Sequence, residues 1–254
     1  MRVVIITQDE PFYLSENLEY LVSVLPEHSK IVGCVVASAS PFGKKQGFIK
    51  KSWKTATTFG VAFFMYYAIR FILRKINGRG RIRFTLKRLG IPSIELDNSI
   101  NHPESLDRIA CYKPDLLVSV LGNEIFKKKL IELAPKGCLN LHTALLPKYR
   151  GLMPTFWVLR FNEVETGVSV FYVDEGIDSG PIVVQKHVPI NSETQESLIR
   201  LTKRLGMEAI AEAINLIELD QVMLIDNEAS KMSYYSFPTN EDVKAFRLAG
   251  KRFF

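Results

Sequence analysis

Short runs of β-branched and other apolar residues recur along this chain, and they constrain its fold more than any other feature. They lie at 2–7, 30–38, 91–96 and 114–121, and each suits a parallel strand buried on both faces. A stretch with helical spacing at 15–25 separates the first two runs. Strands that alternate with helices predict an α/β, Rossmann-like fold with a mostly parallel, doubly wound sheet.

The second half of the chain continues the pattern and then changes it. A helix is expected at 123–134, followed by a fifth strand at 137–142. Two further strands, at 166–173 and 180–190, have shorter connections and are expected to pair at the far edge of the sheet. A long amphipathic helix at 192–218 then begins with the capping pattern Ser-x-x-Gln.

The positive charge of the chain is concentrated in one interval. The formal net charge is +6, yet no Asp or Glu occurs between Glu27 and Glu95, an interval that holds fourteen Lys or Arg residues. Such a segment indicates an anionic partner, which could be a membrane surface, a nucleic acid or a phosphorylated substrate.

The same interval contains an inserted hydrophobic helical segment. Residues 41–88 are too many for a simple crossover, and 55–73 carry one charge, Arg70, in nineteen residues. A single membrane crossing is excluded, because the strands before and after must share a sheet. Two interpretations remain: a helix or re-entrant hairpin in the membrane interface, with flanking cations on anionic headgroups, or a packed helix in the core or in a homodimer.

Cysteine and histidine usage bounds the chemistry and the compartment. Cys34, Cys111 and Cys138 form no CxxC pair, which favours reduced thiols in the cytoplasm. The four histidines show no metal-ligand spacing, so we expect no metal site. The N-terminus lacks the features of a signal peptide. We therefore expect a cytoplasmic protein, with peripheral attachment to the inner face of the membrane through 50–80 as an alternative.

Polar side chains at the end of the fifth strand are the first candidates for chemistry. Asn140 and His142 are two positions apart, so they share one face at the carboxyl end, where open α/β sheets bind ligands. An amide donor and an imidazole suit a developing oxyanion, although either could be a satisfied polar group. Asp178, in a turn rich in Gly and Asp, could bond the imidazole or could serve the turn alone.

A wider pattern includes these three residues. Asn-x-His-x-x-Leu-Leu-Pro-x-Tyr-Arg-Gly is followed by Thr-Gly-Val-Ser-Val and Val-Asp-Glu-Gly-Ile-Asp-Ser-Gly-Pro-Ile, and over roughly 110–200 the chain resembles the folate-dependent formyltransferases. The resemblance implies an enzyme that moves a formyl group from 10-formyltetrahydrofolate, as donor substrate, to a primary amine. It implies that Asn140, His142 and Asp178 are catalytic. The cofactor-binding positions it implies are Val120, Leu121, Gly122, Asn123 and Ile125.

The acceptor amine is less constrained. A tail of few residues after the long helix leaves little room for the nucleic-acid-binding domain of methionyl-tRNA formyltransferases, so we do not expect nucleic acid as a partner. An amino sugar on a nucleotide or lipid carrier is the expected acceptor. The alternatives are a methionyl-tRNA formyltransferase-like enzyme lacking that domain and a non-catalytic, membrane-attached folate-binding module. Lys148, Tyr149 and Arg150 either meet an acceptor phosphate or form a solvated loop.

The same resemblance suggests a division of the chain. Residues 1–218 are expected to form the catalytic domain, with the hydrophobic basic insertion at about 41–88, and 219–254 a short C-terminal extension. The sequence does not specify the oligomeric state, so a homodimer remains open.

Overall fold

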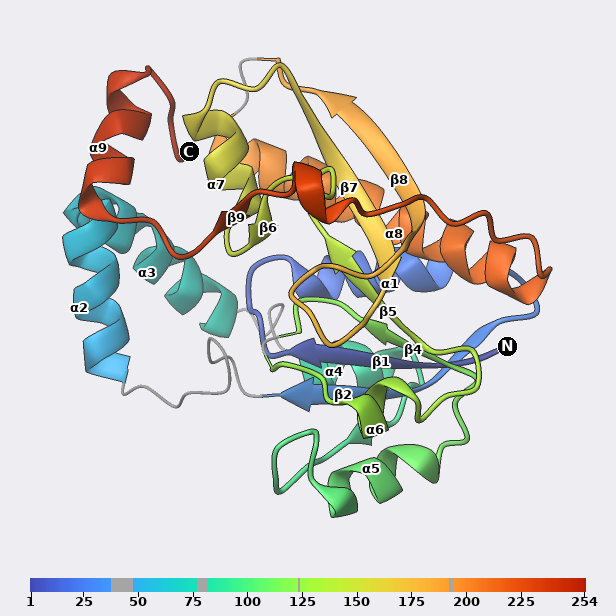
Figure 1. Cartoon of the computed structure of the whole chain (residues 1–254). Coiled ribbons are helices and arrows are strands. Elements are labelled where there is room, and N and C mark those ends of the chain that lie inside the picture. Colours follow the sequence, from blue (N-terminus) through green and yellow to red (C-terminus); the bar gives the residue numbers. More distant parts are fainter. Residues whose placement is uncertain (38–47, 77–81, 123, 192–193) are drawn as a thin grey trace.

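A seven-stranded sheet organises the computed structural model, which describes all residues except 38–47, 77–81, 123 and 192–193 (Figure 1). Its strand order is β3-β2-β1-β4-β5-β7-β8. The strands are β1 (Arg2–Gln8), β2 (Lys30–Ala37), β3 (Ser93–Ile94), β4 (Leu116–Ser119), β5 (Cys138–His142), β7 (Glu165–Tyr172) and β8 (Ile182–Pro189). A separate two-residue pairing joins β6 (Arg150–Gly151) to β9 (Tyr234–Tyr235).

The direction of the strands confirms the expected fold class. β3, β2, β1, β4 and β5 run parallel, whereas β7 and β8 are antiparallel and close the sheet beyond β5. The helices are α1 (Leu14–Val24), α2 (Phe48–Phe59), α3 (Val61–Ile76), α4 (Ile82–Arg88), α5 (Pro103–Ala110), α6 (Lys128–Ile131), α7 (Pro154–Arg160), α8 (Gln195–Glu218) and α9 (Asn240–Leu248), with a 3₁₀ turn at Ala229–Lys231.

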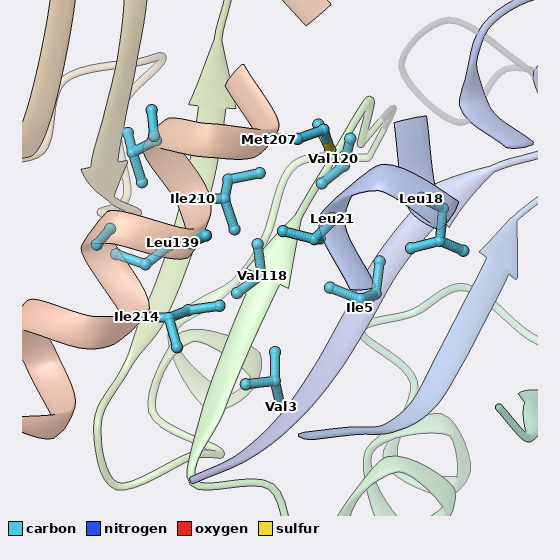
Figure 2. Packing of buried hydrophobic residues seen from close by; sticks show 14 of the residues in the cluster. Val3, Ile5, Leu18, Leu21, Val118, Val120, Leu139, Met207, Ile210 and Ile214 are labelled. Atoms are coloured by element: carbon cyan, nitrogen blue, oxygen red, sulfur yellow. The ribbon is translucent and has the colours of Figure 1, made fainter. Parts of the chain in front are cut away.

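Alternation along the central strands creates a core on each face of the sheet. Val3 and Ile5 of β1 face α1 and α8, as Figure 2 shows, and pack with residues such as Leu21 and Ile210. Val4 and Ile6 alternate with them along β1 and belong to the opposite cluster, beneath α5 and α6. Both faces are therefore covered, which is why these strands are almost wholly apolar.

The hydrophobic insertion forms a helix pair, α2 and α3, that is broken at Gly60. This glycine has φ +86°, a left-handed conformation that disfavours other residues and ends α2. Over the residues described, no helix combines the length and the hydrophobicity that a membrane crossing needs. The apolar stretch 55–73 is thus divided between α2 and α3, where the sequence suggested one continuous stretch.

A third apolar cluster attaches the helix pair to the C-terminal part of the chain. Phe59 is 2% exposed and packs against Phe63, Phe237 and Phe253, with ring centroids 4.7–5.7 Å apart. Phe246 of α9 belongs to the same cluster and stacks on Phe253. Residues after α8 therefore build part of the core.

Several predicted boundaries were wrong. The expected helix at 123–134 shortens to α6, because the Asn101 side chain bonds the Ile125 carbonyl and the Lys127 amide and holds that segment extended. The strand at 91–96 shortens to β3 at the edge of the sheet. The long helix α8 begins at Gln195 under a Thr194 cap, whereas the predicted cap, Ser192, lies outside the described residues.

Candidate active site

Asn140 and His142 stand at the carboxyl end of β5, in the middle of the sheet. β5 is the last parallel strand, with β4 on one side and the antiparallel β7 on the other. Asn140 is paired in register with Ser119 of β4, and His142 with Ser169 of β7. Both side chains line one pocket, as expected from their spacing of two.

The imidazole of His142 is buried between two oxygen atoms. Its Nε2 lies 2.7 Å from the carbonyl oxygen of Tyr149, and its Nδ1 lies 3.6 Å from Oδ2 of Asp178. A carbonyl can only accept, so Nε2 carries a proton and donates it to Tyr149. The Nδ1 edge is therefore the one that faces Asp178 and the pocket.

Asp178 reaches this position from a tight turn after β7. Its φ of 48° is left-handed, a conformation that Asp tolerates better than most residues. The carboxylate Oδ2 accepts the backbone N–H of Gly151 at 2.8 Å, which fixes its orientation toward the imidazole. The structure thus brings the three residues of the predicted catalytic set together in one place.

A residue that the sequence did not single out positions this turn. The side chain of Asn227, which is buried, donates to the carbonyl oxygens of Asp178 and Gly180, both at 2.9 Å. The guanidinium of Arg150 in turn donates to Asn227 Oδ1 at 2.8 Å. Asn227 is 49 residues from Asp178 and carries no local motif, so the tertiary structure alone reveals it.

Two residues of the loop 148–150 fit neither of its two interpretations. Arg150 is buried and bonded to Asn227, and Tyr149 is buried with its ring stacked on Tyr235. Lys148 alone of the three is exposed. Tyr149 and Arg150 are therefore structural supports of the site.

The pocket at this edge of the sheet has a volume of about 180 Å³. It combines the ends of β4 and β5, the Asp178 turn, and the faces of α1 and α8. Its lining residues are Leu14, Asn17, Val120, Leu121, Gly122, Asn140, Leu141, His142, Thr143, Gly151, Pro154, Asp178, Lys203 and Met207.

Three of the five residues expected to hold the donor line the pocket. Val120, Leu121 and Gly122 line the pocket, and a Cβ at Gly122 would meet Oγ of Ser119 at 2.4 Å, so a larger residue there would displace the Ser119 hydroxyl. Asn123 lies outside the described residues. Ile125 is not among the pocket-lining residues in the described part of the chain, and its side chain is 59% exposed.

Lys203 of α8 adds a positive charge that the sequence analysis did not identify. It lines the pocket, lies over the ring of Tyr13 at 5.8 Å, and forms no ion pair with any residue the structure describes. Burial lowers the pKa of Lys203, an effect that the nearby Glu10 carboxylate offsets in part. The Glu10 carboxylate already accepts the backbone N–H groups of Phe12, Tyr13 and Leu14.

Comparison with known proteins places this architecture in a family. Residues 84–214 match the family model described as "Formyl transferase", and the chain belongs to that family. The methionyl-tRNA formyltransferase of Kosmotoga olearia is 33% identical over 175 residues, which cover 66% of this chain and 56% of that protein. The chain spans about half the length of the curated relatives it matches.

Solved structures share the fold at low sequence identity. The phosphoribosylglycinamide formyltransferase of Anaplasma phagocytophilum has a TM-score of 0.65 at 17% identity, over 94% of this chain and 99% of that chain. The N-formyltransferase of Helicobacter canadensis, solved with folinic acid and dTDP-3-aminofucose, has a TM-score of 0.58 at 19% identity, over 93% of this chain and 71% of that chain.

Proposed function

We propose that this protein transfers a formyl group from 10-formyltetrahydrofolate to a primary amine, and that the acceptor is an amino sugar on a nucleotide or lipid carrier. One observation carries the proposal: an amide, an imidazole and a carboxylate, from Asn140, His142 and Asp178, line one pocket at the carboxyl end of β5. These are the groups that the resemblance to formyltransferases assigns to the reaction, and the chain belongs to that family.

The chemistry requires no covalent enzyme intermediate. The acceptor nitrogen attacks the formyl carbon, and the carbonyl oxygen becomes an oxyanion. The amide N–H₂ of Asn140 and a proton on Nδ1 of His142 are the donors proposed to stabilise it. The C–N bond to the folate then breaks, while the ammonium proton of the acceptor passes to the departing folate nitrogen through Asp178 or water.

Asp178 has a second role in this scheme. Its Oδ2 lies close to Nδ1 of His142 and is fixed by the Gly151 amide, so it keeps the ring oriented and favours a proton on Nδ1. The donor is proposed to lie against Val120, Leu121 and Gly122, where the end of β4 opens onto the same pocket. Both substrates would then meet beside the three polar groups, and proximity adds to the rate.

The charge within the pocket supports a phosphate-bearing acceptor. Lys203 and Asn17 face the pocket from α8 and α1, on the side formed by the two helices that cover this face of the sheet. An ammonium group without an ion pair among the described residues is a natural partner for a phosphate. Nucleotide-linked and lipid-linked amino sugars both carry that group.

A second candidate acceptor is charged initiator tRNA. The observation that favours it is sequence similarity, because methionyl-tRNA formyltransferases are 33–36% identical to this chain over the matched segments. The matched segment, however, covers about half the length of each of these proteins.

Two further proposals concern partners and location. We propose a cytoplasmic protein that attaches peripherally to the inner face of a membrane through the insertion, with a second copy of the chain as the competing partner for the same surface. The support is the exposed apolar face of α3.

Mass-spectrometric screening of acceptors tests the proposed function. Purified protein with 10-formyltetrahydrofolate is given aminated nucleotide sugars, uncharged tRNA and methionine-charged tRNA. We expect a mass gain of one formyl group on an amino sugar alone. Formylation of the charged tRNA would select the second candidate, and folate binding without transfer to any amine would indicate a non-catalytic binding module.

A further inference from the structure

The helix α3 has two faces of opposite character. Five aliphatic or sulfur-containing side chains, spaced three or four residues apart, lie on one side and are 48–74% exposed: Val61, Met65, Ile69, Ile72 and Ile76. With 3.6 residues per turn, this spacing forms a single stripe along the whole helix. Trp53 of the neighbouring α2 is also exposed, at 73%.

The opposite face of α3 is fixed to the body of the protein. Tyr67 packs edge-on against Phe12, with ring centroids 5.3 Å apart. The guanidinium of Arg70 pairs with Glu196 of α8 at 2.6 Å, and that of Arg74 donates to the Pro11 carbonyl at 3.0 Å. Turning the helix to bury its outward stripe would break all of these contacts, so the stripe is held outward.

The sequence around this stripe is basic and free of carboxylates. No Asp or Glu lies between Glu27 and Glu95, so residues 48–76 of the helix pair contain none, and Lys or Arg precedes and follows α3. A cavity of about 380 Å³ adjoins the Gly60 break between the two helices and is lined in part by Lys244 and Arg247 of α9. An apolar stripe in a segment whose charged residues are all positive matches the profile of an anionic bilayer surface.

We propose that α3 docks this protein onto the surface of an anionic membrane, with its outward stripe among the acyl chains. A 16-residue helix is about 24 Å long, which is shorter than the hydrocarbon layer, and the stripe runs along its side. The helix therefore lies in the plane of the surface. Each aliphatic side chain that leaves water strengthens such binding by roughly tenfold or more.

Docking has a consequence for the pocket, and this consequence rests on the proposed function. The inward face of α3 contacts Pro11 and Phe12, which lead directly into α1, and Leu14 and Asn17 of α1 line the pocket. Figure 1 shows α3 beside the carboxyl edge of the sheet. A docked molecule would hold the pocket near the headgroups, where the amine of a lipid-carried acceptor is presented.

Vesicle flotation of the full chain tests the docking without any substrate, so its outcome is independent of formyl transfer. Vesicles of phosphatidylcholine, with or without phosphatidylglycerol, are compared at low and high salt. We expect the protein to float with the phosphatidylglycerol vesicles and to be released by salt. The double variant Ile69→Glu/Ile72→Glu should lower the vesicle-bound fraction at least about tenfold.

Two controls keep the result interpretable. Met223→Glu changes a residue that is 85% exposed outside the helix pair, and it should float like the unaltered protein. The milder Ile69→Ser/Ile72→Ser variant, with thermal melting of each protein, separates lost docking from lost folding. Light scattering reports whether the stripe joins two copies of the chain.

Three results would overturn the proposal. One is failure of the unaltered protein to float with phosphatidylglycerol vesicles at low salt. Another is equal flotation of the unaltered protein and the folded stripe variants. The third is a stable dimer that does not float and that the stripe variants convert to monomers, which would assign the stripe to a second copy of the chain.

Discussion

At the scale of single residues, the orientation of the His142 ring is the detail on which the chemistry depends. Nε2 donates to the Tyr149 carbonyl, so the ring cannot rotate freely, and Nδ1 is left facing Asp178. A residue change that removes the negative charge at 178 while keeping its shape should therefore act on the reaction and leave the fold intact.

The variant Asp178→Asn is predicted to lower kcat/KM for formyl transfer by about a hundredfold or more, which is the usual contribution of a positioned acid–base group. Asp174→Asn in the same turn is the matched control, because Asp174 bonds Gly176 and Ser179 and does not line the pocket in the described chain. Steady-state kinetics and thermal melting of both variants make the comparison. Equal losses in the two would assign Asp178 to the turn alone.

Lys203 allows a prediction about the acceptor. The variant Lys203→Met should raise KM for a phosphate-bearing acceptor about tenfold, the loss of one charge-assisted contact, and leave donor binding unchanged. Lys186→Met, which removes a surface pair with Glu212, should leave both unchanged.

The pH dependence of the same contact has a definite sign. Burial lowers the pKa of Lys203, and the charged form exists below that pKa. KM for the acceptor should therefore rise as the pH is raised through the pKa of Lys203. This rise should begin at a lower pH than it would for an ordinary lysine, whose pKa is about 10.4. Lys203→Arg should move the rise to higher pH, and a KM that is flat with pH in the unaltered protein would argue against a phosphate at this position.

The placement of some pocket residues could be predicted from the sequence and that of others could not, for a physical reason. Asn140 and His142 share a strand face, which spacing alone specifies, and the family motif added Asp178. Asn227 and Lys203 are 49 and 25 residues away from Asp178 in the sequence, and no local pattern marks them. They reach the site through tertiary packing alone.

At the scale of elements, strands were easier to predict than helix ends. The apolar runs of β1, β2 and β4 are long enough to specify buried strands, whatever surrounds them. The limits of α6 and α8 instead depend on side-chain bonds from Asn101 and Thr194. The insertion was predicted as helical, but its division at Gly60 and its attachment to α8 needed the structure.

The contact between α3 and α8 centres on Glu196, and it gives a stability prediction. Although burial alone would raise the pKa of Glu196, hydrogen bonds from Tyr66 and Arg200 and the charge of Arg70 hold it below its usual value. The variant Glu196→Gln should lower the free energy of unfolding at neutral pH by about 2 kcal/mol. Glu212→Gln, at an exposed pair, should cost about 0.5 kcal/mol.

The sign of the pH effect follows from that lowered pKa. The stabilisation is fully present above the unfolded-state pKa of about 4.3 and is lost as the pH falls through the lower folded-state value. Denaturant unfolding at a series of pH values should show the unaltered protein and Glu196→Gln converging in acid. A difference between them that grows toward low pH would contradict the assignment.

At the scale of the whole molecule, we propose that residues 219–254 function as one unit with residues 1–218. Asn227 holds the Asp178 turn, β9 pairs with β6, and Phe246 and Phe253 complete the aromatic cluster. Residues 219–254 are therefore an extension in sequence that contributes to both the site and the core.

Removal of 219–254 should thus destabilise the protein by several kcal/mol, because the buried Phe246 and Phe253 alone contribute about 3–5 kcal/mol each. The single variant Asn227→Ala should keep the fold. It should lower kcat, because Asp178 would no longer be held in place by the Asn227 side chain. Asn215→Ala, outside the pocket lining in the described chain, is the control. A truncated protein that melts and turns over normally would show that the extension is dispensable.

The proposed formyl transfer is tested most directly by a single-turnover measurement on the unaltered protein and on Asn140→Ala, with an amino-sugar nucleotide as acceptor. We expect transfer by the unaltered protein and a rate about 10²–10³ lower in the variant, with unchanged affinity for the donor. An undiminished rate in Asn140→Ala would contradict the proposal, as would an unaltered protein that binds the folate and formylates no amine.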